Sequence, residues 1–169
     1  MLYRIKQFFW AIESFYKKVD MEFIERYLDD DEKKLFNLLS KSDRNHSIRV
    51  AKDLLEYVES FKETGVYTSK VRLVKVALLH DIGKIERPLN VFEKSIIVLL
   101  DKLTKGKINK YNKFKFIDIY YNHAEKGHDM LVRKGKYDAE FLNIIKEHHN
   151  TEYQGNKIFQ LIKYFDNKN

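Results

Sequence analysis

Histidine and aspartate residues lie on or beside the apolar faces of segments whose spacing predicts helices. His46, for example, falls on the same stripe as Val50, Leu54 and Tyr57, because residues three or four positions apart share one face of a helix. Six further residues follow apolar residues at similar spacings: His80, Asp81, His123, His148, His149 and Asp166. A buried polar group without a partner costs on the order of 1–3 kcal/mol. Each of these residues alone is more typical of a hydrogen-bonded core side chain, whereas seven that converge favour one shared partner.

The rest of the sequence predicts an all-α fold. No period-two pattern of β-branched residues lasts long enough to predict a sheet, and one proline and six glycines in 169 residues favour helices. Capping residues mark expected helix starts at Asp43, at Thr68 or Ser69, at Asn90 and at Asp138. The predicted helices are 3–18, 20–39 with a break near 29–31, 43–62, 69–82, 91–103, 114–134, 138–149 and 156–167.

A metal centre is the partner that the histidines and aspartates would share. Imidazole and carboxylate groups without thiolate suit iron, manganese, nickel or zinc, and the number of ligands predicts two divalent ions rather than one. Neighbouring residues on a helix point about 100° apart, so His80 can bind one ion while Asp81 bridges both. We expect Gly83 to end this helix in a left-handed conformation and to leave room beside the metals.

Composition limits the class of protein. The chain has no cysteine, which excludes disulfides, thiolate ligands and a cysteine nucleophile, and which fits a cytoplasmic location. The longest aliphatic run, 96–100, is far shorter than the roughly 20 residues of a membrane-spanning helix, so we expect no membrane partner. The formal net charge of +7 favours an anionic partner. We expect a small phosphate-containing substrate such as a nucleotide, whereas no aromatic-interleaved motif supports binding of a nucleic acid.

The order of these residues resembles the HD-domain superfamily of metal-dependent phosphohydrolases. His80-Asp-Ile-Gly-Lys84 matches the HDIG form of its central signature, and the resemblance covers residues 42–167. The chain looks similar to stand-alone bacterial HDIG proteins with two metals. The resemblance implies a single compact helical bundle, in which residues 41–169 form the HD domain and residues 1–40 an N-terminal helical extension packed on it.

The resemblance also implies roles for individual residues. It assigns His46, His80 and Asp166 to one ion and His123, His148 and His149 to the other, with Asp81 as the bridge. It places Lys84 beside the substrate phosphate, so that Asp81 and Lys84 are the expected catalytic residues. Two departures matter. No Gly-Tyr-Pro motif follows His149, which leaves cyclic di-GMP unsupported as the substrate, and Ser42 replaces a glutamate that binds a third metal in some relatives.

These features predict hydrolysis of a nucleotide or another phosphate ester, in which a metal-activated hydroxide attacks phosphorus in line with the leaving oxygen. Two alternatives remain open. Some HD-domain proteins with a similar ligand set are mixed-valent di-iron oxygenases, and others are non-catalytic modules that sense a nucleotide. The paired His148 and His149 favour a phosphodiesterase, and the intact ligand set argues against a degraded sensor.

Overall fold

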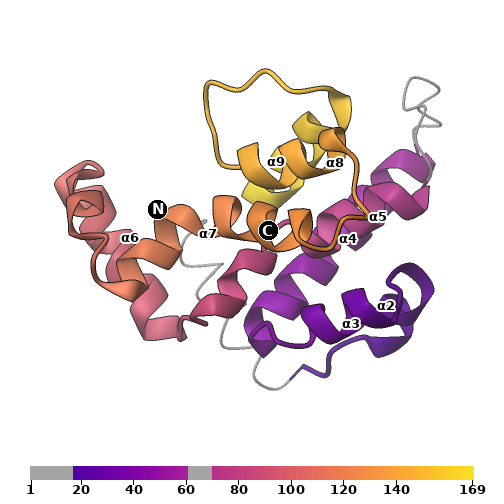
Figure 1. Cartoon of the computed structure of the whole chain (residues 1–169), viewed down its shortest axis with the longest axis horizontal. Coiled ribbons are helices and arrows are strands. Elements are labelled where there is room, and N and C mark those ends of the chain that lie inside the picture. The colour runs from indigo at the N-terminus through magenta and orange to yellow at the C-terminus, as the bar shows by residue number, and fades with distance from the viewer. Residues whose placement is uncertain (1–16, 61–69) are drawn as a thin grey trace.

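The computed structural model describes residues 17–60 and 70–169 (Figure 1). Within these ranges the chain forms eight α-helices, two short 3-10 helices and no strand, which confirms the predicted all-α fold. The elements are α2 (Met21–Tyr27), α3 (Asp30–Phe36), α4 (Lys41–Ser60), α5 (Lys70–Leu79), η1 (Ile82–Glu86), α6 (Val91–Thr104), η2 (Lys107–Tyr111), α7 (Lys115–Val132), α8 (Ala139–Glu147) and α9 (Lys157–Lys168). The helix predicted over 3–18 lies outside the described residues.

Helix α5 lies in the middle of the bundle and is apolar along its C-terminal half. Its buried residues are Leu73, Val74, Val76, Ala77, Leu78 and Leu79. A consecutive run of buried apolar residues has to be enclosed by other elements, and α5 packs against α2, α4, α8 and α9. Phe36, Leu54, Ile145 and Phe159 complete the core around it. The C-terminal end of α5 therefore emerges inside the domain and not at its surface.

The helix boundaries confirm some of the predicted caps. Asp138 accepts a hydrogen bond from the backbone of Phe141, and Asn90 forms a capping box with Glu93 at the start of α6. The predicted break near 29–31 is also present, between α2 and α3. The expected start of α5 at 68 or 69 lies outside the described residues.

The prediction that Asp43 begins a helix is wrong. Helix α4 begins at Lys41, and the Ser40 hydroxyl accepts a hydrogen bond from the Asp43 backbone nitrogen at 3.2 Å. Ser40 and Asp43 have the spacing of a capping box, in which a serine is followed three residues later by an acidic residue. Asp43 therefore lies within the first turn, where its side chain is buried.

Two of the helices that end earlier than predicted stop just before a pair of candidate ligands. Helix α5 ends at Leu79 rather than at residue 82, and α8 ends at Glu147 rather than at residue 149. The pairs His80-Asp81 and His148-His149 consequently lie immediately after a helix and not within one. The stripe of apolar residues predicted which side these pairs face but not where the hydrogen-bonded helix stops.

The predicted left-handed conformation of Gly83 is also wrong. Among the described glycines, only Gly106 and Gly135 have positive φ. A Cβ atom on Gly83 would lie 1.9 Å from the carbonyl oxygen of His123 and 2.6 Å from the backbone nitrogen of Gly127. Gly83 is thus required because the backbone of η1 lies directly against the backbone of α7.

Helix α6, η2 and the first turns of α7 form a projection at one side of the domain (Figure 1). The stretch 105–115, most of which lies between two predicted helices, contains η2. Lys94 connects the projection to α4 because its Nζ atom donates to Asp43 at 2.5 Å. None of the helices in the described ranges is long and apolar enough to cross a membrane.

Candidate metal centre

The structure brings the seven predicted ligands together in two adjacent groups. One group contains His46 from α4, His80 after α5 and Asp166 from α9. The other contains Asp81, His123 from α7, and the pair His148 and His149 after α8. Within each group, one possible ligand atom from every residue lies within 4.8 Å of the others. Each group therefore has the donor types and the spacing to hold one metal ion.

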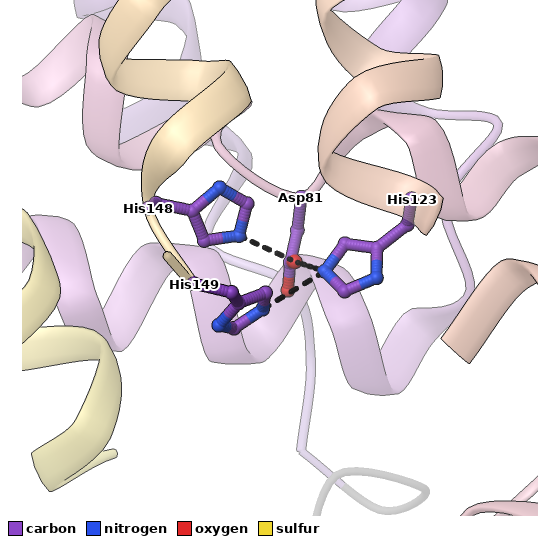
Figure 2. Close-up of side chains that lie close together, drawn as sticks. All are labelled: Asp81, His123, His148 and His149. Carbon is purple, nitrogen blue, oxygen red and sulfur yellow. Dashed lines mark hydrogen bonds and ion pairs between the residues drawn. The ribbon is translucent and has the colours of Figure 1, made fainter. Parts of the chain in front are cut away.

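Asp81 lies between the two groups and presents one oxygen to each. Its Oδ2 atom lies 3.4 Å from His80 Nε2 and 3.7 Å from His46 Nε2. Its Oδ1 atom lies 3.2 Å from His123 Nε2 and 3.8 Å from His148 Nε2. Figure 2 shows Asp81 between the rings of His123, His148 and His149. This is the placement that a carboxylate needs to bridge two ions.

Three of the histidines are oriented by the same kind of hydrogen bond. Nδ1 of His80 donates to the Ala77 carbonyl at 2.7 Å, and Nδ1 of His148 donates to the Ile145 carbonyl at 2.7 Å. Nδ1 of His123 donates to a carbonyl of the preceding helical turn at 3.0 Å. Because a carbonyl can only accept, the proton of each neutral ring is on Nδ1. The Nε2 lone pair then faces the centre, as metal-binding histidines require.

Several buried polar atoms at the centre have no hydrogen-bond partner among the described residues. They include Nε2 of His80, Nε2 of His148 and Oδ1 of Asp81. Leaving such an atom unsatisfied costs on the order of 1–3 kcal/mol. A divalent cation would satisfy all three, because neutral imidazole nitrogens and carboxylate oxygens are ordinary ligands of iron, manganese, nickel and zinc. The residues therefore fit a metal centre.

Comparison with known proteins agrees with this site. The HD domain family model matches residues 44–167, a range that includes all seven residues. The chain belongs to the HD domain family. HD domains bind divalent metals, and the two groups supply the residues with which this HD domain could do so. No significant match was found among curated proteins or among solved structures.

The metal-free HD domain balances the charge of its carboxylates with protons and a lysine. Burial disfavours charge on Asp81, but the positive charges of Lys84 and His80 hold its pKa well below the usual range. Burial likewise opposes charge on Asp166, yet the hydrogen bond to His46 and the nearby positive charge of His80 keep its pKa low. Burial alone would lower the pKa of His80, whereas the two carboxylates raise it to about 10. Positive charge is therefore stabilised at the place where a cation would bind.

Lys84 lies beside the carboxylate of Asp81. Its ammonium group contacts Oδ2 of Asp81, and its side chain is 26% exposed. Burial would lower the pKa of Lys84, but the negative charges of Asp81 and Asp43 raise it. Lys84 therefore remains an ammonium ion beside Asp81.

Asp43, which the sequence predicts only as a helix cap, also belongs to this region. Its buried carboxylate accepts hydrogen bonds from Lys94 at 2.5 Å and from the Ser40 hydroxyl at 2.5 Å. Burial raises the pKa of Asp43, but Lys94 and Lys84 lower it further, so the group is anionic. The spacing of Ser40 and Asp43 would have placed Asp43 inside the helix. Nothing in the sequence places Lys94 beside it.

The centre opens to solvent on the side of His149. The His149 side chain is 49% exposed, whereas that of His46, the next most exposed histidine of the two groups, is only 18% exposed. His149 Nε2 lies 3.0 Å from His123 Nε2, so its ring covers the second group from outside. His128 belongs to neither group and instead contacts Asp129.

Proposed function

We propose that this HD domain is a metal-dependent phosphohydrolase that cleaves a nucleotide or another phosphate ester at a centre of two divalent ions. The placement of Asp81 carries the proposal, because its two oxygens face two separate groups of ligands. In this assignment His46, His80 and Asp166 hold one ion, and His123, His148 and His149 hold the other. Such ions supply Lewis acidity and lower the pKa of a bound water.

The side chains themselves set the geometry of the reaction. Asp81 fixes the two groups relative to each other, because it follows the enclosed helix α5 and is only 1% exposed. The backbone bonds of His80 and His148 keep their Nε2 atoms directed at the centre. Groups held in this way need little rearrangement as charge develops, which is the main source of electrostatic catalysis.

Charge favours an anionic substrate. Two carboxylates, Asp81 and Asp166, opposed by two divalent ions leave a net charge of about +2, which would attract a phosphate group. Once the Asp81 oxygens are occupied by metal, the Lys84 ammonium loses its present partner. Lys84 is then free to bind a non-bridging phosphate oxygen at the side of the centre. The exposed ring of His149 marks the side from which the substrate would approach.

Metal content and hydrolysis, measured together, test the proposal. Protein purified without added metal, then supplied with manganese or iron, should contain about two ions per chain and hydrolyse a chromogenic phosphodiester or members of a nucleotide panel. Asp81→Asn should lose both ions and lower the rate by at least about 100-fold. Asp129→Asn, which alters a 59%-exposed carboxylate on α7, is the matched control and should leave both unchanged.

A second variant separates metal binding from substrate binding. Lys84→Gln should keep both ions but lower the rate by about 10–100-fold, because it removes charge stabilisation only. Retention of activity in Asp81→Asn would refute the proposal. Oxygen consumption by a di-iron form without phosphate release would assign the centre to oxygenase chemistry. Nucleotide binding without turnover in metal-replete protein would assign it to a sensor.

A further inference from the structure

The outward face of helix α6 is apolar. Phe92, Ile96, Leu99 and Leu103 are 75%, 54%, 57% and 69% exposed. At 100° per residue these four side chains fall within an arc of about 60°. The inward face of the same helix is also apolar, because Ile97 is buried in the domain. Helix α6 therefore has two apolar faces, of which the described residues cover only one.

This face is about as large as the largest apolar patch that a typical monomeric protein exposes. Leu100 is 36% exposed at the edge of this face. Together with the four seam residues it exposes on the order of 500 Å² of mostly apolar surface, which falls in the range of patches that are often functional. Two such patches placed together would bury on the order of 1,000 Å² in total, about the minimum for a specific protein–protein interface. Tyr111 and Phe114, both also exposed in the same projection, can extend it.

The spacing of the four residues indicates that the partner is a helix. They are separated by four, three and four positions, which is the a and d spacing of two heptads in a coiled coil. Such a seam packs its side chains between those of a facing helix. A flat sheet edge or a small-molecule pocket would not require this spacing over three turns of helix.

We propose that the partner is α6 of a second copy of the chain, packed antiparallel in a two-fold symmetric dimer. A two-fold axis lets one face pair with itself and closes the assembly at two copies. In such a pair the heptad register places Phe92 of one copy near Leu103 of the other. Each protomer contributes the same apolar seam, so both exposed faces become buried.

Charge determines the direction of the pair. At and beyond the C-terminal end of the seam lie exposed lysines with no ion pair among the described residues, namely Lys102, Lys105, Lys107, Lys110, Lys113 and Lys115. A parallel pair would bring the two lysine clusters together. An antiparallel pair separates them by about the length of α6, roughly 20 Å for its 14 residues. That distance is about two Debye lengths at physiological salt, so the repulsion is screened.

Molar mass in solution is the first test. At about 50 µM the full chain should have twice its 20.4 kDa mass if the dissociation constant is about 1 µM or lower. Leu99→Glu should reduce the mass to that of one chain, because it places a charge in the middle of the seam. Leu38→Glu is the matched control, since Leu38 is 62% exposed outside the projection, and it should leave the dimer intact.

Cross-linking tests the direction. The chain has no cysteine, so single introduced cysteines report one contact each. Under oxidation, a mixture of Phe92→Cys and Leu103→Cys chains should form a disulfide between the two variants. Neither variant alone should cross-link, because each cysteine lies far from the equivalent cysteine of the second copy across the two-fold axis. Self-cross-linking of both variants would overturn the antiparallel arrangement.

Other occupants of the face give different results. A full chain that is monomeric at this concentration overturns the proposal, and so does a dimer that survives Leu99→Glu. A monomer that dimerises only after deletion of residues 1–16 would assign the face to that segment instead. Metal content should be the same in Leu99→Glu as in the parent chain, because no proposed ligand lies in α6. This readout separates failure of the dimer from failure of the metal centre.

Discussion

Replacing Gly83 with alanine should damage both the stability of the domain and one half of the metal centre. The added Cβ would lie 1.9 Å from the His123 carbonyl oxygen, and both atoms nearest to it belong to the backbone of α7. Real Cβ atoms essentially never approach closer than 3.0 Å. The backbones of η1 and α7 must therefore separate by about 1 Å or more, since no flexible side chain can move away instead.

The magnitude follows from this displacement. Forcing an extra carbon into a packed contact costs about 1–3 kcal/mol, which for a chain of this size lowers the melting temperature by about 3–10 °C. In the parent chain, His123 Nε2 lies 3.2 Å from Asp81 Oδ1. The same displacement moves His123 away from Asp81. Loss of ligand orientation by this amount should weaken metal binding at the second group by about 10–100-fold, while the group of His46, His80 and Asp166 is affected less.

Thermal unfolding and metal titration of the same samples measure both effects. Gly106→Ala is the matched control, because Gly106 has φ of 79° but nothing within 4 Å of its Cβ position. That variant should lose about 1–2 kcal/mol through left-handed strain alone and keep its metal. The reasoning is refuted if Gly83→Ala melts within about 1 °C of the parent chain, or if it binds both ions with unchanged affinity.

Two further predictions concern other charged groups. Metal binding near pH 8 should release a proton from His80, because its pKa of about 10 in the metal-free domain keeps it charged there, and a metal ligand has to be neutral. The affinity should consequently rise with pH up to about 10, and calorimetric titration in two buffers of different ionisation enthalpy would measure the proton. Glu32→Ala should destabilise the domain by about 2–4 kcal/mol, because the Glu32 carboxylate is 1% exposed and accepts from Lys75 at 2.8 Å and from the Tyr137 hydroxyl at 2.9 Å. Chemical denaturation would measure the loss, and Asp31→Ala, in the same helix but 68% exposed, should change stability by less than about 1 kcal/mol.

The sequence was sufficient to predict the grouping of the proposed ligands. Helical spacing relates each histidine to apolar residues on its own segment, and burial of those apolar residues carries the histidine inward with them. The order of the residues then resembled a known family, which divided them between two ions. The same division appears in the two groups of the structure, with His46, His80 and Asp166 in one and Asp81 among the others.

The features that were not predicted depend on contacts between distant segments. Gly83 was interpreted through the local preference of glycine for helix ends, whereas the structure shows that it is needed for the contact of η1 with α7. Asp43 was interpreted as a cap, although Lys94, 51 positions later, is its partner. The apolar outward face of α6 could not be recognised from periodicity either, because a helix with two apolar faces resembles one that is fully enclosed.

The ends of α5 and α8 share one hydrogen-bond arrangement. The last carbonyls of a helix have no partner within the helix, and a histidine that follows the helix needs an acceptor for Nδ1–H. His80 uses the carbonyl of Ala77 and His148 that of Ile145, each three positions earlier and each at 2.7 Å. One bond thus satisfies a helix end and fixes a ring for metal binding. Both helix C-termini also direct their partial negative charge toward the centre, which favours cations there. Each of the two core helices thus stops just before His80-Asp81 or His148-His149. Its end provides the hydrogen-bond acceptor, the ring orientation and part of the electrostatic field that a metal centre needs.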